Sequence, residues 1–304
     1  MISKEHREKL DQLSVELNES YENLGAINNF DGINLPSYQK IIEISKTLLE
    51  VLFPGFISHG RIHSKYQQGW IAEKLELLFL EISDQVKNSV KFASPDLCEG
   101  NCDEKARELT ADILNLLPNI RKVLRTDVEA AFIGDPAALH REEIILCYPS
   151  IFAVSLHRVA HEFYKRSVPL IPRMIAEYAH RETGIDIHPG AQINQSFFID
   201  HGTGVVIGET AIIGENVKIY QNVTLGALSF RKDEDGNLLR NKRHPTIEND
   251  VVIYSGSSIL GGDTVVGEKS VVGGNVWITE TIAKDTTILF DSQSQKLKIY
   301  SKSA

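Results

Sequence analysis

The second half of the chain holds several residues whose side chains can move a proton or hold an ion. Asp186 stands 15 residues before His201, Asp200 directly precedes it, and Arg243 and His244 follow later. An imidazole is the side chain best matched to proton transfer near pH 7, and a carboxylate can fix its tautomer. A guanidinium suits a carboxylate because its donors form a bidentate fork. These residue types suit a site that activates a nucleophile.

A six-residue period runs through the same half of the chain. Every sixth residue from Ile187 to Val223, and again from Ile247 to Trp277, is apolar, thirteen positions in all. The sixth positions between these two runs are polar, so we predict a loop there. This period is typical of a hexapeptide β-helix, in which short strands meet at turns and stack coil upon coil. We expect the sixth-position side chains to point inward as ladders, with glycines at the corners.

The first 180 or so residues have a helical pattern instead. Apolar residues at helical spacing predict helices over residues 64–93, 103–117 and 152–165, and a last one from about Pro172 to Gly184. The first 130 residues contain no catalytic motif. We therefore interpret this half as a packing or oligomerisation domain.

Composition excludes several classes of protein. Of the 304 residues, 42% are hydrophobic and 24% charged, as in ordinary globular proteins. The net charge of −9 disfavours nucleic-acid binding and gives no polybasic reason to bind a membrane. We find no apolar run long enough to span a bilayer and no signal-peptide core at the N-terminus. Three cysteines, an odd number, argue against a disulfide scaffold and for the reducing cytoplasm.

Two weaker signals concern metals. His157 and His161 lie four apart on an expected helix, but packing or surface roles are favoured over a shared metal ion. Cys98 and Cys102 lack a second ligand pair at zinc spacing, so we expect free thiols. No metal is expected.

Five strings of the chain carry a recognisable pattern: Asp135-Pro136-Ala137, GIDIHPGA (184–191), IDHGTGVVIGET (199–210), NVTLG (222–226) and Arg243-His244-Pro245. Together they resemble the serine O-acetyltransferases, a family of hexapeptide-repeat acyltransferases. The resemblance covers about residues 135–287. It implies an α+β fold in which an all-helical N-terminal domain precedes a left-handed parallel β-helix, the hand resting on the resemblance alone. It also implies homotrimers, or dimers of trimers.

The expected domains follow from the period change and the resemblance together. Residues 1–184 form the helical N-terminal or oligomerisation domain, and residues 185–287 form the catalytic β-helix. A loop, 227–244, is inserted in the β-helix, and residues 288–304 form a C-terminal tail. The role of the charged segment 231–242 within that loop stays open.

The resemblance also implies a reaction and a site. Acetyl-CoA donates its acetyl group to the hydroxyl of L-serine, giving O-acetylserine and CoA, the first step of cysteine biosynthesis from serine. The attack is direct, with no acyl-enzyme. The implied general base is His201, oriented by Asp186; the ammonium of serine is held by Asp135 and Asp200, and its carboxylate by Arg243 and His244.

Acetyl-CoA is implied as the co-substrate, in a groove between coils of adjacent subunits. Small residues let its pantetheine arm approach the backbone closely. The implied backbone contacts are Gly226, Ala227, Ser255, Gly256 and Gly273.

Other readings of single residues stay open. Asp135 also suits a helix N-cap before Pro136, and Arg243 also suits a solvated charge in a basic cluster. Glu209 is as well explained by a corner or an interface as by the site. Feedback inhibition by cysteine is implied by the resemblance and is not decided by the sequence.

The sequence departs from the family pattern at three places, one of which is the absence of a closing Gly-x-Pro-Ala motif. Ala227-Leu228-Ser229-Phe230 replaces a glycine-rich stretch. The chain ends in Ser301-Lys302-Ser303-Ala304, without the terminal isoleucine that many relatives insert into O-acetylserine sulfhydrylase, so we do not expect a complex by that route.

Three rival functions remain. The nearest is a hexapeptide O-acetyltransferase with another hydroxyl acceptor, such as a sugar. A β-helical carbonic anhydrase needs a trio of histidines around a metal, which we do not find. A non-catalytic trimeric scaffold would not need Asp186, His201, Arg243 and His244.

Overall fold

The structure is a computed structural model that describes residues 2–30, 32, 34–57, 60–93, 101–229, 232–291 and 296–301. The chain divides into two compact units, residues 1–34 and 35–304. The first unit contains α1 (Lys4–Asn23), whose N-terminus is capped by the Ser3 side chain and in which no residue is buried, followed by a 3-10 turn at Gly25–Ile27. The predicted boundary between residues 184 and 185 lies inside the second unit.

The second unit begins with helices that lead to the β-helix. Helix α8 ends where glycine adopts a left-handed conformation, φ 69° at Gly184, as the sequence predicts. The helix predicted over 103–117 ends at Leu114, and Leu117 begins a new helix with Pro118 in its first turn. The helices are α2 (Tyr38–Leu52), α3 (Gln67–Ala93), α4 (Cys102–Leu114), α5 (Leu117–Gly134), α6 (Arg141–Cys147), α7 (Pro149–Lys165) and α8 (Ile171–Thr183), with a 3-10 turn at Ser64–Tyr66.

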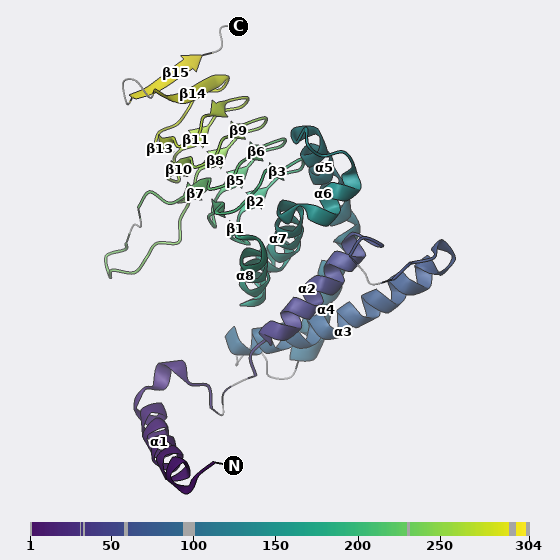
Figure 1. The fold of residues 1–304 in the computed structure, drawn as a ribbon, viewed down its shortest axis with the longest axis vertical. Helices are drawn as coiled ribbons and strands as arrows, with labels where there is room; N and C mark the ends of the chain where they lie inside the picture. The colour runs from purple at the N-terminus through teal and green to yellow at the C-terminus, as the bar shows by residue number, and fades with distance from the viewer. Residues whose placement is uncertain are drawn as a thin grey trace. The chain divides into compact units, whose positions relative to one another are not determined.

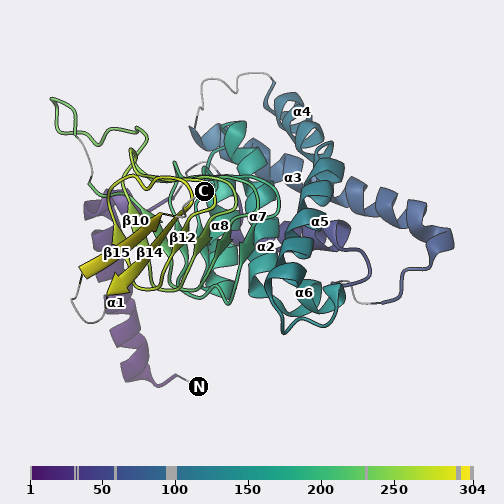
Figure 2. The ribbon, with the colours of Figure 1, turned by 90° about the horizontal axis from the view of Figure 1, so that it is seen from above.

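From Asp186 onward short parallel strands stack into a left-handed β-helix with three sheets (Figures 1 and 2). Helix α8 packs against the first strand and α5 against the third, so the helices cover the first coil. Sheet A contains β1 (Asp186–Ile187), β4 (Val206–Ile207), β7 (Thr224–Gly226), β10 (Ser258–Leu260) and β13 (Trp277–Ile278). Sheet B contains β2 (Gln192–Ile193), β5 (Ile212–Ile213), β8 (Thr246–Ile247) and β11 (Val265–Val266). Sheet C contains β3 (Phe198–Ile199), β6 (Lys218–Ile219), β9 (Val252–Ile253), β12 (Val271–Val272), β14 (Thr286–Asp291) and β15 (Lys296–Ser301).

The interior of the β-helix is filled by ladders of aliphatic side chains, one from each sheet. In sheet A the strand register aligns Ile187 with Ile207, then Leu225, Ile259 and Ile278, all buried. A second buried residue lies two positions before each ladder residue, as Val205 lies before Ile207. Burial of two residues in each hexad excludes water from the interior and supplies the main stabilisation of the stack.

The predicted phase of the inward positions is wrong in the last coil. Val265 and Val271 are only partly buried, and Trp277 is 64% exposed, because Val266, Val272 and Ile278 form the ladder there. The reason is that the coils differ in length. From Ile187 to Ile278, successive ladder residues are six apart except at three corners: eight from Ile199 to Ile207, 22 from Leu225 to Ile247, and seven from Ile259 to Val266. A strict period of six therefore drifts off the ladder.

The end of the chain closes sheet C. Strand β14 pairs in parallel with β12 and then antiparallel with β15, so the described part of the predicted tail forms a hairpin. Among the described helices, none is by itself long and apolar enough to cross a membrane; the bent pair α6 and α7 meets that test only together.

Candidate active site

The edge where sheet C passes into sheet A, here called the C/A edge, carries the candidate base. It comprises residues 200–204, 220–222, 254–256 and 273–275 of successive coils. Its first corner, between Ile199 and Ile207, is two residues longer than a regular corner. Three backbone φ angles there are positive: 61° at His201, 93° at Gly202 and 77° at Gly204. A Cβ at Gly202 would lie 2.5 Å from the Ile185 side chain, so the corner needs glycine there. The corner projects His201 outward, with 70% of its side chain exposed.

Opposite charges lie beside His201. Its Nε2 is 3.9 Å from Asp200 Oδ1, and the other oxygen of Asp200 is 3.0 Å from the Lys218 ammonium. Lys218 also donates to the Gly134 carbonyl at 2.7 Å, at the end of α5. Asp200 is almost fully buried, at 7% exposure, and this ion pair compensates its carboxylate for lost hydration.

Asp135 reaches the same corner from the helical part. It follows the last residue of α5, and its carboxylate accepts hydrogen bonds from Tyr148 Oη and from the Ala137 backbone N–H at 2.8 Å. These bonds, together with Lys218 and His201 nearby, lower the pKa of Asp135, so it is ionised at neutral pH. The alternative of a helix N-cap is wrong, because Asp135 terminates a helix and its side chain closes a turn.

Asp186 is not in contact with His201 in the described chain, since no hydrogen bond or ion pair joins them. Asp186 begins β1 on the outer surface of sheet A, where its backbone N–H bonds to Val205 O at 2.9 Å. Ligand atoms of Glu177, His180 and Asp186 lie within 4.8 Å of one another, and Arg173 pairs with Glu177. The spacing of 15 residues therefore brings Asp186 to the adjoining coil without placing it on His201.

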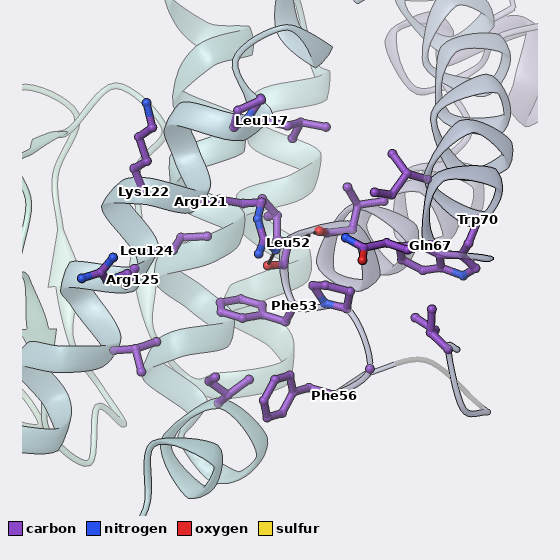
Figure 3. A pocket seen from close by; sticks show the side chains of 18 of the residues that line it. Leu52, Phe53, Phe56, Gln67, Trp70, Leu117, Arg121, Lys122, Leu124 and Arg125 are labelled. Carbon is purple, nitrogen blue, oxygen red and sulfur yellow. Dashed lines mark hydrogen bonds between the residues drawn. The ribbon is translucent and has the colours of Figure 1, made fainter. Parts of the chain in front are cut away.

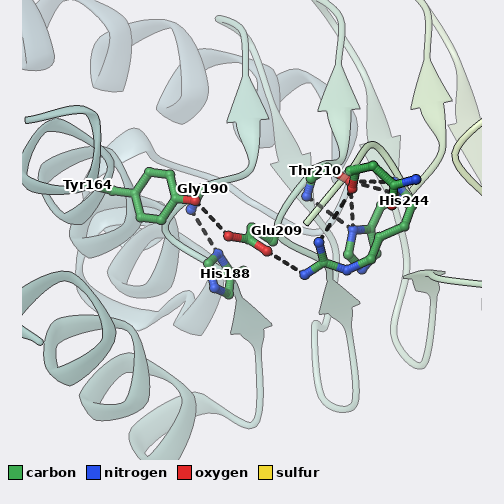
Figure 4. A network of polar contacts seen from close by, with 8 residues as sticks. Tyr164, His188, Gly190, Glu209, Thr210 and His244 are labelled. Atoms are coloured by element: carbon green, nitrogen blue, oxygen red, sulfur yellow. Dashed lines mark hydrogen bonds and ion pairs between the residues drawn. The ribbon is translucent and has the colours of Figure 1, made fainter. Parts of the chain in front are cut away.

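The edge where sheet A passes into sheet B, here called the A/B edge, carries Arg243 and His244. It comprises residues 188–190, 208–210, 226–229, 232–245 and 261–264. The carboxylate of Glu209 accepts hydrogen bonds from Tyr164 Oη at 2.6 Å and from Arg243 Nη2 (Figure 4). Burial acts to raise the pKa of Glu209, but these two bonds outweigh it and lower the pKa. Arg243 is thus held in place and is not a solvated charge, and Glu209 is the residue that holds it.

His244 is buried and neutral on the same edge. Its Nδ1 accepts from the Thr210 backbone N–H at 3.1 Å and lies 2.9 Å from Thr210 Oγ1. Burial and the adjacent cations Arg243 and Lys242 lower its pKa to about 4. Because Nδ1 is an acceptor, the proton of the neutral ring is assigned to Nε2. The ring covers Gly208, where an added Cβ would lie 2.0 Å from His244 Cδ2.

His188 belongs to this edge as well, and sequence reasoning assigned it no role although it lies in the quoted string 184–191. Its Nδ1 accepts from the Gly190 backbone N–H at 3.0 Å, and its ring packs edge-on against Tyr164 (Figure 4). Burial lowers its pKa to about 4. Sequence reasoning also missed Tyr148, Tyr164 and Lys218, which lie outside the recognised strings or bear no motif.

The residues expected to contact acetyl-CoA are divided between the two edges. Ser255, Gly256 and Gly273 lie on the C/A edge in later coils, where Gly256 has a φ of 74°. Gly226 ends β7 and Ala227 follows it at the start of the insertion, on the A/B edge.

Within one chain, the predicted site residues therefore form two groups. Asp135, Asp200 and His201 lie at the C/A edge, and Arg243 and His244 at the A/B edge. Sheet A lies between the two groups. One hexad of extended chain runs from the first edge to the second, and its length is at most about 20 Å. In the chain as described, no hydrogen bond or ion pair links the groups.

Three other features are not part of either edge. A cavity of about 1630 Å³ lies among α2, α3 and α5, where Arg121 donates to the Leu52 carbonyl (Figure 3), and none of the predicted site residues lines it. His157 is buried, and His161 Nδ1 lies 2.8 Å from Pro189 O, so both histidines pack against the first coil. Cys102 is disulfide-bonded, so the expectation of a free thiol is wrong there; Cys98 lies outside the described residues.

A left-handed β-helix capped by helices, with a histidine at an enlarged corner, defines a hexapeptide-repeat acyltransferase. The chain is 45% identical over 267 residues to the plasmid-encoded serine acetyltransferase of Synechococcus elongatus, covering 86% of this chain and 82% of that protein. It is 44% identical over 168 residues to the serine acetyltransferase of Bacillus licheniformis, covering 55% of this chain and 74% of that protein.

Solved structures agree with these relatives. Serine acetyltransferase 1 of Entamoeba histolytica in complex with L-cysteine superposes with a TM-score of 0.70 and 41% identity, covering 81% of this chain and 86% of that one. The native form of serine acetyltransferase 1 from the same organism gives a TM-score of 0.69 at 36% identity, covering 82% and 97%. No family model matches the chain. The chain belongs to the serine acetyltransferase family.

Proposed function

We propose that this protein transfers the acetyl group of acetyl-CoA to the hydroxyl of L-serine, giving O-acetylserine and CoA, the first step of cysteine biosynthesis. The observation that carries this proposal is the enlarged corner of residues 200–204. It exposes an imidazole beside the carboxyl groups of Asp135 and Asp200, on a fold whose relatives are named for this reaction.

His201 is the proposed general base. It takes the hydroxyl proton as the serine oxygen attacks the thioester carbonyl, forming the new C–O bond. The tetrahedral intermediate then expels the CoA sulfur, and the proton on His201 passes to that thiolate. The attack is direct within a ternary complex, so no acyl-enzyme is needed.

The two edges would bind opposite ends of the amino acid. At the C/A edge, Asp135 and Asp200 supply carboxylates for the ammonium group. At the A/B edge, the Arg243 guanidinium and the Nε2–H of neutral His244 supply donors for the carboxylate. Glu209, Thr210 and Tyr164 hold those donors in place before the substrate arrives.

One chain cannot bring these groups together, so we propose that the active site lies between subunits of a homotrimer. The C/A edge of one subunit would face the A/B edge of its neighbour. Exposed apolar residues on the intervening sheet A, Val206 at 38% and Trp277 at 64%, support a contact there. The helical part would join two trimers in a dimer of trimers.

The same arrangement would form the acetyl-CoA groove. Ser255, Gly256 and Gly273 from one subunit would line one wall, and Gly226 and Ala227 from the neighbour the other. The lack of bulky side chains lets the pantetheine arm approach backbone N–H and C=O groups. We propose acetyl-CoA as the co-substrate and no resident metal ion.

Asp186 is the proposed orienting carboxylate for His201. Gly184 O accepts from Gly204 N at 2.8 Å, so the segment before Asp186 stacks directly under the base-bearing corner. The imidazole is exposed, and we propose that it turns toward Asp186 when the substrates bind. A carboxylate there would stabilise the imidazolium that forms during the reaction.

Regulation and location complete the proposal. L-cysteine differs from L-serine only in its sulfur atom, and a solved relative binds it. We propose that it competes with serine at the same site, as a feedback inhibitor in the cytoplasm.

The test measures thiol release from acetyl-CoA by the wild-type protein and His201→Ala. L-serine, L-homoserine and a simple sugar serve as acceptors, and circular dichroism confirms that the variant folds. We expect serine-dependent release that the substitution abolishes. Release with the sugar instead of serine would favour the other-acceptor enzyme, and no release with any acceptor would contradict an acetyltransferase.

A further inference from the structure

Lys218, on β6, is enclosed by acceptors and aromatic rings at the C/A edge, and no motif pointed to it. Its Nζ is 3.0 Å from Asp200 Oδ2 and 2.7 Å from Gly134 O. It lies over the rings of Tyr220, at 4.5 Å, and Phe198, at 5.0 Å. Only 18% of the side chain is exposed. A lysine this enclosed has lost most of its rotamer freedom, so its position is well defined.

The contacts of Lys218 join one carboxylate of the proposed ammonium site to the backbone beside the other. One partner is Asp200 itself. The other is the carbonyl of Gly134, the residue directly before Asp135, at the end of α5. Lys218 thus ties the end of a helix to the corner of the β-helix, and it leaves Asp200 Oδ1 facing the His201 ring at 3.9 Å.

Lys218 also sets the charge beside the proposed base. Two carboxylates and one ammonium leave a net charge of −1, which one substrate ammonium would balance. Burial and the bond to Asp135 raise the pKa of Tyr148, so this phenol stays neutral. The titratable and charged groups that face His201 from the packed elements are Asp135, Tyr148, Asp200, Lys218 and Tyr220.

We propose that Lys218 is a positioning residue of the active site: it holds Asp200 and the end of α5 in register and keeps the surroundings of His201 from becoming more negative. This inference rests on the proposed function, because it assigns His201 the role of base. Without Lys218, the carboxyl groups of Asp135 and Asp200 would lie near the imidazole with no cation among them. That charge distribution favours the protonated ring, which cannot accept a proton.

The experiment compares wild type, Lys218→Met and Lys218→Arg in serine-dependent thiol release across pH 5.5 to 9. Lys218→Gln is a second uncharged variant in case the methionine variant does not fold. Lys269→Met is the matched control, since Lys269 pairs with Glu268 at 2.9 Å on the edge between sheets B and C, remote from His201.

In the uncharged variants we expect the acidic limb of the profile of kcat/KM against pH to move to higher pH by about half a unit. The shift is this small because solvent screens the charges around an exposed imidazole. The KM for L-serine should rise about fivefold, with the KM for acetyl-CoA unchanged. Lys218→Arg keeps the positive charge, so its acidic limb should lie at the wild-type pH. Lys269→Met should leave both the acidic limb and the KM for L-serine as in wild type.

The results separate this inference from the proposed function. No serine-dependent release by wild type would overturn the proposed function itself. An active wild type whose uncharged Lys218 variants keep the wild-type limb would overturn the inference, even if they lose thermal stability. A limb that moves equally in Lys218→Arg would also overturn it, because charge would then not be the cause.

Discussion

The two edges of the β-helix prepare their side chains in different ways. At the C/A edge a corner with positive φ angles projects an exposed imidazole toward solvent, near charged groups. At the A/B edge His244 is buried and neutral, and Arg243 is already bound by Glu209. The first edge leaves its reactive group free to move a proton, and the second holds fixed donors. From this difference we propose that the C/A edge supplies the base beside the ammonium site, and that the A/B edge binds the serine carboxylate.

The largest expected effect comes from removing the base at the C/A edge. His201→Ala should lower kcat by about 10³-fold, because general-base catalysis contributes on the order of 10² to 10⁴. The KM for L-serine should change little, since the ammonium and carboxylate sites remain. Steady-state kinetics with varied serine measure both constants. A raised KM with kcat intact would give this edge a binding role instead.

Removing the Arg243 side chain from the A/B edge should affect KM more than kcat, the opposite of the result expected for His201→Ala. Arg243→Ala should raise the KM for L-serine about a hundredfold, because a charged hydrogen-bonded pair is worth about 2–5 kcal/mol when one partner is removed. The kcat at saturating serine should fall less than tenfold. A variant in which kcat alone collapses would argue against the division of roles.

A smaller effect is expected where the backbone approaches His244. Gly208→Ala should lower kcat/KM about tenfold, because the new methyl group would meet the imidazole at 2.0 Å and displace it. Gly69→Ala, in α3 with open space around it, is the control and should be neutral. Equal activity in both variants would show that His244 need not keep this position.

The smallest effect concerns stability and pH. The pKa of both His188 and His244 is lowered to about 4 from 6.5, mainly by burial. Below pH 6.5 the unfolded chain therefore binds more protons than the folded one, and stability falls as pH decreases from 6.5 toward 4. Melting temperature should drop across this window by less in His188→Gln than in wild type. An identical drop would contradict burial as the source.

Much of this fold follows from residue spacing, but the exact phase does not. The period of six and the change after Gly184 predict the helical part and the β-helix, and the strings 184–191 and 199–210 locate His201. The number of residues in each coil cannot be predicted from the period of six alone. The one extra residue between Ile259 and Val266 shifts the ladder by one position, so Trp277 lies outside. Two of the irregular corners carry residues of the proposed site: His201 lies at the first, and Arg243 and His244 lie in the insertion.

The partners of the site residues were the least predictable part. Tyr148, Tyr164 and Lys218 act through contacts between elements far apart in the chain, such as Lys218 with Gly134. No local pattern encodes such contacts. The expected pairing of Asp186 with His201 came from the resemblance, and it stays a prediction.

The central claim is that each active site combines the C/A edge of one subunit with the A/B edge of another. His201→Ala and Arg243→Ala chains, each with its own affinity tag, can be co-expressed, and mixed oligomers isolated through both tags. Neither variant alone should turn over serine appreciably at low concentration. Every mixed trimer contains one interface in three that pairs two intact edges, so about a third of wild-type activity should return. Mixed oligomers no more active than the separate variants would show that each chain holds its own complete site.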